Sequence, residues 1–135
     1  MAPNFIMNPD SDNPTELKDF RDNVVIIYIG ASWCIYCRQF EPKLDEIYQS
    51  TKNDNLKIIK ILTDYKEEDF IKKLSPDKEI YNVFNQWDLK NLIAIYPNDY
   101  YPFYYLIDKF GMIRAKGNPN SPVFLNNLNA LLKGE

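Results

Sequence analysis

Cys34 and Cys37 are the residues of this sequence best suited to chemistry, and they stand three positions apart in Trp33-Cys34-Ile35-Tyr36-Cys37. Two thiols at this spacing at the start of a helix can close into a small disulfide ring. Unpaired N–H groups and the helix dipole favour a thiolate at the first position, so we expect Cys34 to be the nucleophile. Cys37 lies one turn deeper and is expected to be the shielded thiol that resolves a mixed disulfide at Cys34.

Two predicted elements position this pair. The run from Val24 to Ile29 is β-branched and aromatic without interruption, which is typical of a buried central strand. A helical pattern follows from Cys34 to about Lys52, with Pro42 inside it, where a proline is expected to kink the axis. The apolar residues of this helix recur at helical spacing on one face: Phe40, Leu44, Ile47 and Tyr48.

The rest of the chain alternates between helical and extended patterns, which predicts one α/β domain with a mixed sheet over residues 1–135. Residues 1–13 are expected to be a loosely ordered N-terminal segment. Residues 77–99 are expected to be irregular to helical. Further strands are predicted at 56–62, 103–107 and 112–116, and helices at 13–21, 67–74, 89–95 and 123–133.

Composition excludes several classes of function. The chain has 16 Lys and Arg, 19 Asp and Glu, a net charge of −3, two cysteines and no histidine. Without histidine there is no Cys–His or Ser–His pair, and a four-ligand Cys/His zinc site cannot form. The mildly acidic charge does not suit a general nucleic-acid binder, and no apolar run approaches the ~20 residues of a membrane span. We therefore expect no metal, no nucleic-acid partner and no direct membrane insertion. No cofactor is expected either, because the two sulfurs can carry the redox chemistry.

Redox exchange is the favoured interpretation of the cysteine pair, because a strand, a turn, C-x-x-C and a helix in this order are more specific than C-x-x-C alone. Three alternatives stay open. A structural disulfide would stabilise little across so short a loop. A metal or cluster would need carboxylates or a second chain to complete four ligands. Inert buried thiols are the third.

Tyr101-Pro102, at the entry to the predicted strand 103–107, is the second notable feature. A proline is tolerated at the first position of a strand, and an X-Pro bond can be cis at modest cost. An ordinary trans bond is favoured by frequency alone. Pro97, after Tyr96, is a competing candidate for a cis proline but lies further from the strand.

The chain resembles the thioredoxin superfamily. Residues 31–37 resemble its A-x-W-C-x-x-C signature, Pro42 matches its helix-kinking proline, and residues 101–111 resemble its Y-P-T-x-x-L-I-D-x-x-G stretch. The L-I-D-x-x-G-x-I hairpin, Thr63-Asp64 after the second strand and the long segment before Pro102 are most similar to the TlpA/ResA type.

This resemblance implies a thioredoxin fold, with a central mixed sheet flanked by helices on both faces. It also implies a cis Pro102 that faces the disulfide and, with the Tyr101 backbone, holds a substrate strand. The implied activity is dithiol–disulfide exchange with proteins, in which Cys34 attacks, Cys37 resolves and a redox partner recycles the dithiol. A periplasmic or otherwise extracytoplasmic reductase is favoured, its signal or anchor having been removed. A disulfide oxidase or isomerase, a redox-inert interaction module and a cytoplasmic location are the alternatives.

Several residues depart from the family pattern. Tyr28 stands where thioredoxins carry a buried Asp, and Phe40 stands where many TlpA/ResA relatives carry a Glu. Ile35-Tyr36 stands between the cysteines, where most relatives have a Pro or Gly. The reduction potentials of the relatives therefore cannot be assigned to the Cys34–Cys37 couple. Phe103 replaces a Thr, and its bulk is expected to narrow the substrate groove.

Other candidates surround the cysteines. Glu41 is a candidate proton acceptor for Cys37, although a solvated surface carboxylate is the favoured interpretation. Arg38 is a candidate positive charge near the thiols, with a surface cation favoured. Trp33 is expected to flank the groove beside Cys34, and Tyr36 to contact substrate.

The aromatic residues of the segment 77–101 form a cover over the sheet in the favoured interpretation. A docking surface for a protein substrate, with Trp87 in it, is the alternative.

Overall fold

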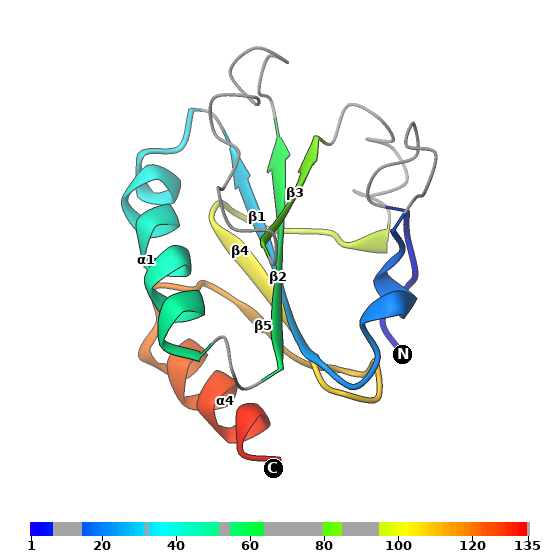
Figure 1. Cartoon of the computed structure of the whole chain (residues 1–135). Coiled ribbons are helices and arrows are strands. Elements are labelled where there is room, and N and C mark those ends of the chain that lie inside the picture. The colour runs from blue at the N-terminus through cyan, green and yellow to red at the C-terminus, as the bar shows by residue number, and fades with distance from the viewer. Residues whose placement is uncertain (7–14, 32, 52–54, 64–79, 85–94, 135) are drawn as a thin grey trace.

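The structure, a computed structural model, describes residues 1–6, 15–31, 33–51, 55–63, 80–84 and 95–134. Within these ranges the chain forms one 3-10 helix, two α-helices and five strands (Figure 1). In chain order they are η1 (Leu17–Phe20), β1 (Val24–Ala31), α1 (Ile35–Thr51), β2 (Leu56–Thr63), β3 (Ile80–Phe84), β4 (Phe103–Ile107), β5 (Ile113–Gly117) and α4 (Pro122–Leu132).

β1 lies at the centre of a five-stranded sheet with the order β3-β2-β1-β4-β5. It pairs in parallel with β2 and antiparallel with β4, while β2 and β3 are parallel and β4 and β5 antiparallel. All of β1 is buried, as its continuous apolar run predicts. The predicted α/β class with a mixed sheet is confirmed.

β3 corrects the prediction that residues 77–99 are irregular to helical. Its five residues pair in parallel with β2, with Ile80 opposite Ile58 and Phe84 opposite Leu62. Strand preference depends on the partner strand and the surrounding burial more than on the segment itself. The β-branched and aromatic residues of Ile80–Phe84 therefore form a strand where β2 supplies the pairing partner.

The sheet separates two apolar layers. α1 and α4 lie over one face, and η1 with the N-terminal segment lies over the other (Figure 1). Ile26 and Tyr28 of β1 pack in the layer under α1 and α4. Ile27 and Ile29 pack in the opposite layer, because successive side chains of a strand point to opposite faces.

α1 contains Pro42 inside the helix and buries the face that the sequence predicts. Phe40, Leu44 and Tyr48 are buried, and Ile47 packs at the edge of the same layer. The spacing of these apolar residues thus fixes which side of α1 faces the sheet, and with it the direction of Cys37.

Residues 1–6 are the described part of the segment expected to be loosely ordered, and they make contacts with the sheet. Ala2 and Phe5 are buried, and the Ala2 N–H donates to the Gly111 carbonyl at 2.8 Å. Two apolar side chains and a backbone hydrogen bond thus join residues 1–6 to the rest of the domain.

The first helix is η1, with Glu16 as its N-cap and the Glu16 N–H donating to Asp19 Oδ2 at 2.8 Å. Several expectations lie outside the described residues: the helix start at Asn13 and Pro14, the helices at 67–74 and 89–95, and the residues Asp64 and Trp87.

Asp108 shapes the turn between β4 and β5. Its Oδ1 accepts the N–H groups of Phe110 and Met112, each at 2.9 Å, and its Oδ2 accepts from the Arg114 guanidinium at 3.3 Å. Burial raises the pKa of Asp108, but the three donors outweigh it and hold that pKa below its usual value. Gly111 completes the turn with a φ of 85°, a conformation that glycine adopts without strain.

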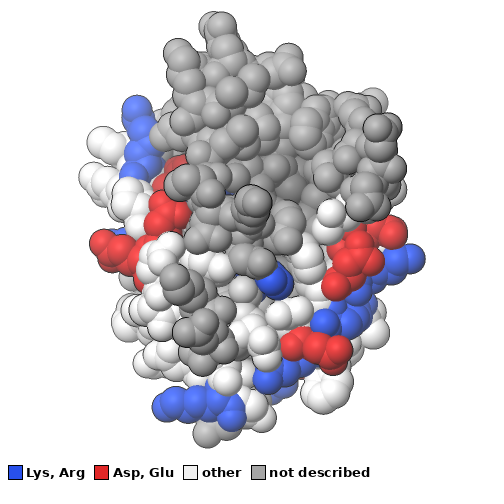
Figure 2. Space-filling view, viewed as in Figure 1, with Lys and Arg blue, Asp and Glu red and all other residues white. Residues whose placement is uncertain are grey.

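Charged side chains of both signs are interspersed on the described part of the surface in Figure 2. No helix within the described ranges has the length and apolar character needed to cross a membrane.

Candidate active site

Cys34 and Cys37 form a disulfide at the junction between the end of β1 and the start of α1. Their Cα atoms are 5.2 Å apart. Cys37 lies in the first turn of α1 and is fully buried, while Cys34 just precedes the helix and is 4% exposed. Ala31, at the end of β1, and the partly buried Tyr101 pack against the pair.

The start of α1 is electrostatically suited to a thiolate at Cys34. The Cys37 N–H donates to Cys34 Sγ at 3.1 Å. The first turn of α1 contains no acidic residue that would oppose negative charge. Arg38 is exposed, as expected for a surface cation. Among the described residues, the groups that favour a thiolate at Cys34 are therefore backbone N–H groups and the N-terminus of α1.

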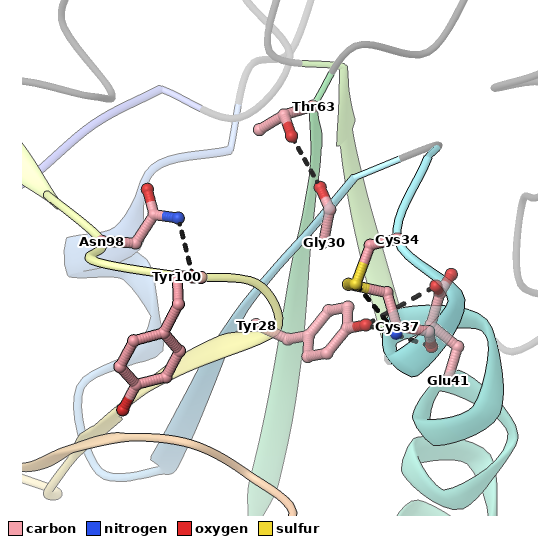
Figure 3. Close-up of a disulfide and its surroundings, with 8 residues drawn as sticks. All are labelled: Tyr28, Gly30, Cys34, Cys37, Glu41, Thr63, Asn98 and Tyr100. Carbon is pink, nitrogen blue, oxygen red and sulfur yellow. Dashed lines mark hydrogen bonds between the residues drawn. A yellow bond between two sulfur atoms is a disulfide. The ribbon is translucent and has the colours of Figure 1, made fainter.

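Tyr28 of β1 points toward the first turns of α1 (Figure 3). Its hydroxyl lies 3.3 Å from the Cys37 carbonyl oxygen and 3.5 Å from Glu41 Oε2, and it can donate to either. Tyr28 is fully buried. A buried hydroxyl needs an acceptor, and this one has two within reach, the Cys37 carbonyl and the Glu41 carboxylate.

Glu41 is 8% exposed, which overturns the favoured expectation of a solvated surface carboxylate. It stands four positions after Cys37, and residues four positions apart lie on the same face of a helix. Because that face is turned to the sheet, Glu41 is carried inward with Cys37. The spacing was the signal in the sequence that could have revealed this burial.

Gly30 makes room for the ring of Tyr28. A Cβ at position 30 would lie 2.9 Å from Tyr28 Cε1 and 3.1 Å from its hydroxyl oxygen. On the helix side the ring stacks with Phe40 at a centroid distance of 5.9 Å and an interplanar angle of 19°. The Gly30 carbonyl also accepts from Thr63 Oγ1 at 2.9 Å, which joins the ends of β1 and β2 (Figure 3).

The loop before β4 brings Tyr101 and Pro102 beside the cysteines. The Tyr101–Pro102 peptide bond is cis. The Tyr101 ring meets Trp33 edge to face, with centroids 5.1 Å apart. Asn98 Nδ2 donates to the Tyr100 carbonyl at 3.0 Å within the same loop (Figure 3).

Two hollows meet beside the disulfide. The larger has a volume of about 550 Å³ and is lined by Trp33, Cys34, Ile35, Tyr36 and the residues 98–101. The smaller, of about 280 Å³, is lined by Tyr36, Gln39, Tyr101, Pro102, Asn118 and Asn120. Tyr36 and Tyr101 line both, so the two hollows adjoin at these side chains. Together they are called the groove below, and Cys34 lines its larger part.

The structure brings together the residues singled out in the sequence. Trp33 is 62% exposed and Tyr36 is 64% exposed, and both line the larger hollow with Cys34. Large apolar side chains seldom stay this exposed next to one another without a role in binding. Phe103 lines neither hollow and is buried, so the expected narrowing of the groove by its bulk does not occur.

A family model described as AhpC/TSA matches residues 1–116. The chain belongs to the AhpC/TSA family. The predicted membership of the thioredoxin superfamily, close to the ResA type, is confirmed. This AhpC/TSA-family chain is 31% identical over 94 residues to the thiol-disulfide oxidoreductase ResA of Bacillus thuringiensis. The match covers 70% of this chain and 49% of that protein, so the chain spans about half the length of this curated relative.

Solved structures with similar folds cover nearly the whole AhpC/TSA-family chain. The thioredoxin domain of a thiol-disulfide oxidoreductase from Bacteroides vulgatus has a TM-score of 0.76 and 25% identity, covering 96% of this chain and 94% of that one. A thiol:disulfide interchange protein from Bacteroides sp. has a TM-score of 0.76 and 26% identity, covering 98% and 88%. The predicted thioredoxin-like fold is therefore confirmed.

Proposed function

We propose that this chain is a thiol–disulfide oxidoreductase that exchanges its Cys34–Cys37 couple with protein substrates. The observation that carries the proposal is the placement of the couple at the start of α1, with the Cys37 N–H directed at Cys34 Sγ. The names of the relatives, a thiol-disulfide oxidoreductase and an interchange protein, support the same activity.

The first step is attack by the reduced Cys34 thiolate on a substrate disulfide. A bond forms between Cys34 Sγ and one substrate sulfur, the substrate S–S bond breaks, and the other substrate sulfur leaves as a thiolate that takes a proton from water. The backbone N–H and the helix terminus stabilise the Cys34 thiolate before attack.

The second step is resolution by Cys37. Its thiol loses a proton, its thiolate attacks Cys34 Sγ, and the substrate leaves with its second sulfur reduced. Two electrons have then passed from the Cys34–Cys37 dithiol to the substrate, and the disulfide seen in the structure has formed. The two sulfurs carry this chemistry without a cofactor.

Glu41 is proposed as the acceptor of the Cys37 proton. A buried thiol cannot deliver its proton directly to bulk water, and the chain has no histidine to accept it. Glu41 is buried on the Cys37 face of α1 and lies within reach of the Tyr28 hydroxyl, which also contacts the Cys37 carbonyl. Tyr28 is thus proposed to position Glu41.

The groove is proposed to hold the substrate strand. Pro102 and the Tyr101 backbone would align an extended segment by β-type hydrogen bonds, while Trp33 and Tyr36 contact its side chains. All four residues line the two hollows beside the disulfide. Arg38 lines neither hollow and is left with the role of a surface cation.

Reduction of extracytoplasmic protein disulfides is the proposed direction, with a separate redox partner that returns the couple to its dithiol form. A redox titration of the couple against glutathione and dithiothreitol tests it. A potential near the thioredoxin value of about −270 mV would support a reductant, whereas one near about −120 mV would make the chain an oxidant. A couple that never exchanges with either thiol would reject the oxidoreductase itself.

A further inference from the structure

Asp99 is the charged side chain among the described residues that line the larger hollow. It is exposed, and the remaining described lining is aromatic, aliphatic, amide or sulfur. Arg38, the cation nearest in sequence to the cysteine pair, lines neither hollow. Among the described residues, the part of the groove next to Cys34 therefore combines an apolar wall with one negative charge, that of Asp99.

Aromatic rings provide most of that wall. Trp33 and Tyr36 are more than half exposed, and Tyr100 is 45% exposed. The Trp33 ring packs edge to face against Tyr101, and this contact holds it in an exposed position beside the hollow. Exposed aromatic faces attract cations, and the aliphatic stem of an Arg or Lys packs well on apolar surface.

A guanidinium matches both features of the hollow at once. It can stack on an aromatic ring while its N–H groups donate to a carboxylate. An acidic side chain would instead meet the negative charge of Asp99 and the negative faces of the rings. An uncharged side chain would leave the Asp99 carboxylate without a new partner.

The smaller hollow continues the groove past Tyr101 and Pro102 with a different lining. Gln39, Asn118 and Asn120 place three amide side chains there, and no charged residue is among its described lining. An extended segment that crosses from one hollow to the other would thus meet a cation-preferring half near Cys34 and an uncharged polar half beyond it.

We propose that the groove selects substrate segments in which an Arg or Lys lies within about two residues of the cysteine that Cys34 attacks. This inference rests on the proposed oxidoreductase function and names its substrate class. The basic side chain occupies the hollow lined by Trp33, Tyr36, Asp99 and Tyr100, and pairs with Asp99.

The test uses short peptides that differ only in the residue beside a single cysteine, which is Arg, Ala or Glu. Each peptide carries the cysteine as a mixed disulfide with thionitrobenzoate. The reduced chain joins Cys34 to the peptide sulfur and releases coloured thionitrobenzoate. The Arg peptide is expected to react about five- to tenfold faster than the Glu peptide at low salt, with the ratio falling as salt is raised.

Asp99→Asn is expected to remove most of this preference, while the matched variant Asp45→Asn, which changes a carboxylate on α1 outside both hollows, keeps it. The salt dependence of the unmodified chain gives a second readout that needs no variant. Equal rates for the Arg and Glu peptides would overturn the inference. So would a ratio of these rates that changes neither with salt nor with Asp99→Asn.

A small probe, the mixed disulfide of mercaptoethanol with thionitrobenzoate, separates this inference from the proposed function. Fast reaction with the small probe and equal rates with all peptides would reject the substrate class alone. Failure to react with the small probe and with every peptide would reject the oxidoreductase function.

Discussion

The Tyr28 hydroxyl lies 3.5 Å from Glu41 Oε2, in the buried layer between β1 and α1. It also reaches the Cys37 carbonyl at 3.3 Å, so the side chain of a central strand connects the inner cysteine to a carboxylate. Two other ionisable residues neighbour Tyr28 in the sheet: Lys60 pairs with it on β2 and Tyr104 on β4. Burial raises the pKa of Tyr104.

Glu41→Gln is expected to slow the resolving step. Removing the proposed proton acceptor should lower the rate of Cys37 attack by about 10- to 100-fold near neutral pH, with the loss shrinking at alkaline pH, where hydroxide deprotonates the thiol. Stopped-flow measurement of substrate release across pH checks this. Glu46→Gln, on the exposed side of α1, is the matched control. An unchanged pH profile in Glu41→Gln would remove Glu41 from the mechanism.

Tyr28→Phe should reproduce a milder form of the same pH change, because Glu41 remains but loses its positioning contact. The rate of Cys34 alkylation should stay the same, since the N–H groups near Cys34 are untouched. Unfolding should become easier by about 1 kcal/mol, the usual worth of a buried hydrogen bond. Loss of stability without any change in the pH profile would make Tyr28 purely structural.

Gly30→Ala should destabilise the fold through Tyr28. The added methyl would lie 2.9 Å from Tyr28 Cε1, closer than such contacts allow, and overpacking of this kind costs about 1–3 kcal/mol. Urea unfolding measures the cost. In a Tyr28→Ala background the same substitution should cost much less, and an equal cost in both backgrounds would show that the ring is not the cause.

Asp108 should make stability depend on pH at acidic values. Its pKa is lowered in the folded state, so its contribution is fully present above the unfolded value of about 3.8 and is lost as pH falls through the folded pKa. Asp108→Asn should therefore flatten the decline in unfolding free energy as pH falls below about 4. An unchanged slope in that range would contradict the role given to Asp108.

The arrangement of β1, Cys34, Cys37 and α1 could be predicted because local signals agree there. A continuous apolar run indicates a central strand, and the apolar spacing from Phe40 to Tyr48 fixes the inward face of the helix. Those two signals place Cys37 inside and Cys34 at the helix start without any long-range information.

Long-range contacts account for what the sequence did not reveal. β3 forms by pairing with β2, and the sequence of Ile80–Phe84 does not indicate which strand it pairs with. The contact of Glu41 with Tyr28 joins residues 13 positions apart on a helix and a strand. Ala2 likewise donates its backbone N–H to Gly111, far along the chain.

Trapping of the mixed disulfide tests the central claim most directly. Cys37→Ser, mixed with a disulfide-bonded protein substrate, is expected to form a one-to-one covalent adduct that mass spectrometry detects and dithiothreitol releases. Cys34→Ser should form none, because its remaining thiol is the fully buried Cys37. An adduct that forms with Cys34→Ser, or no adduct with either variant, would contradict the account.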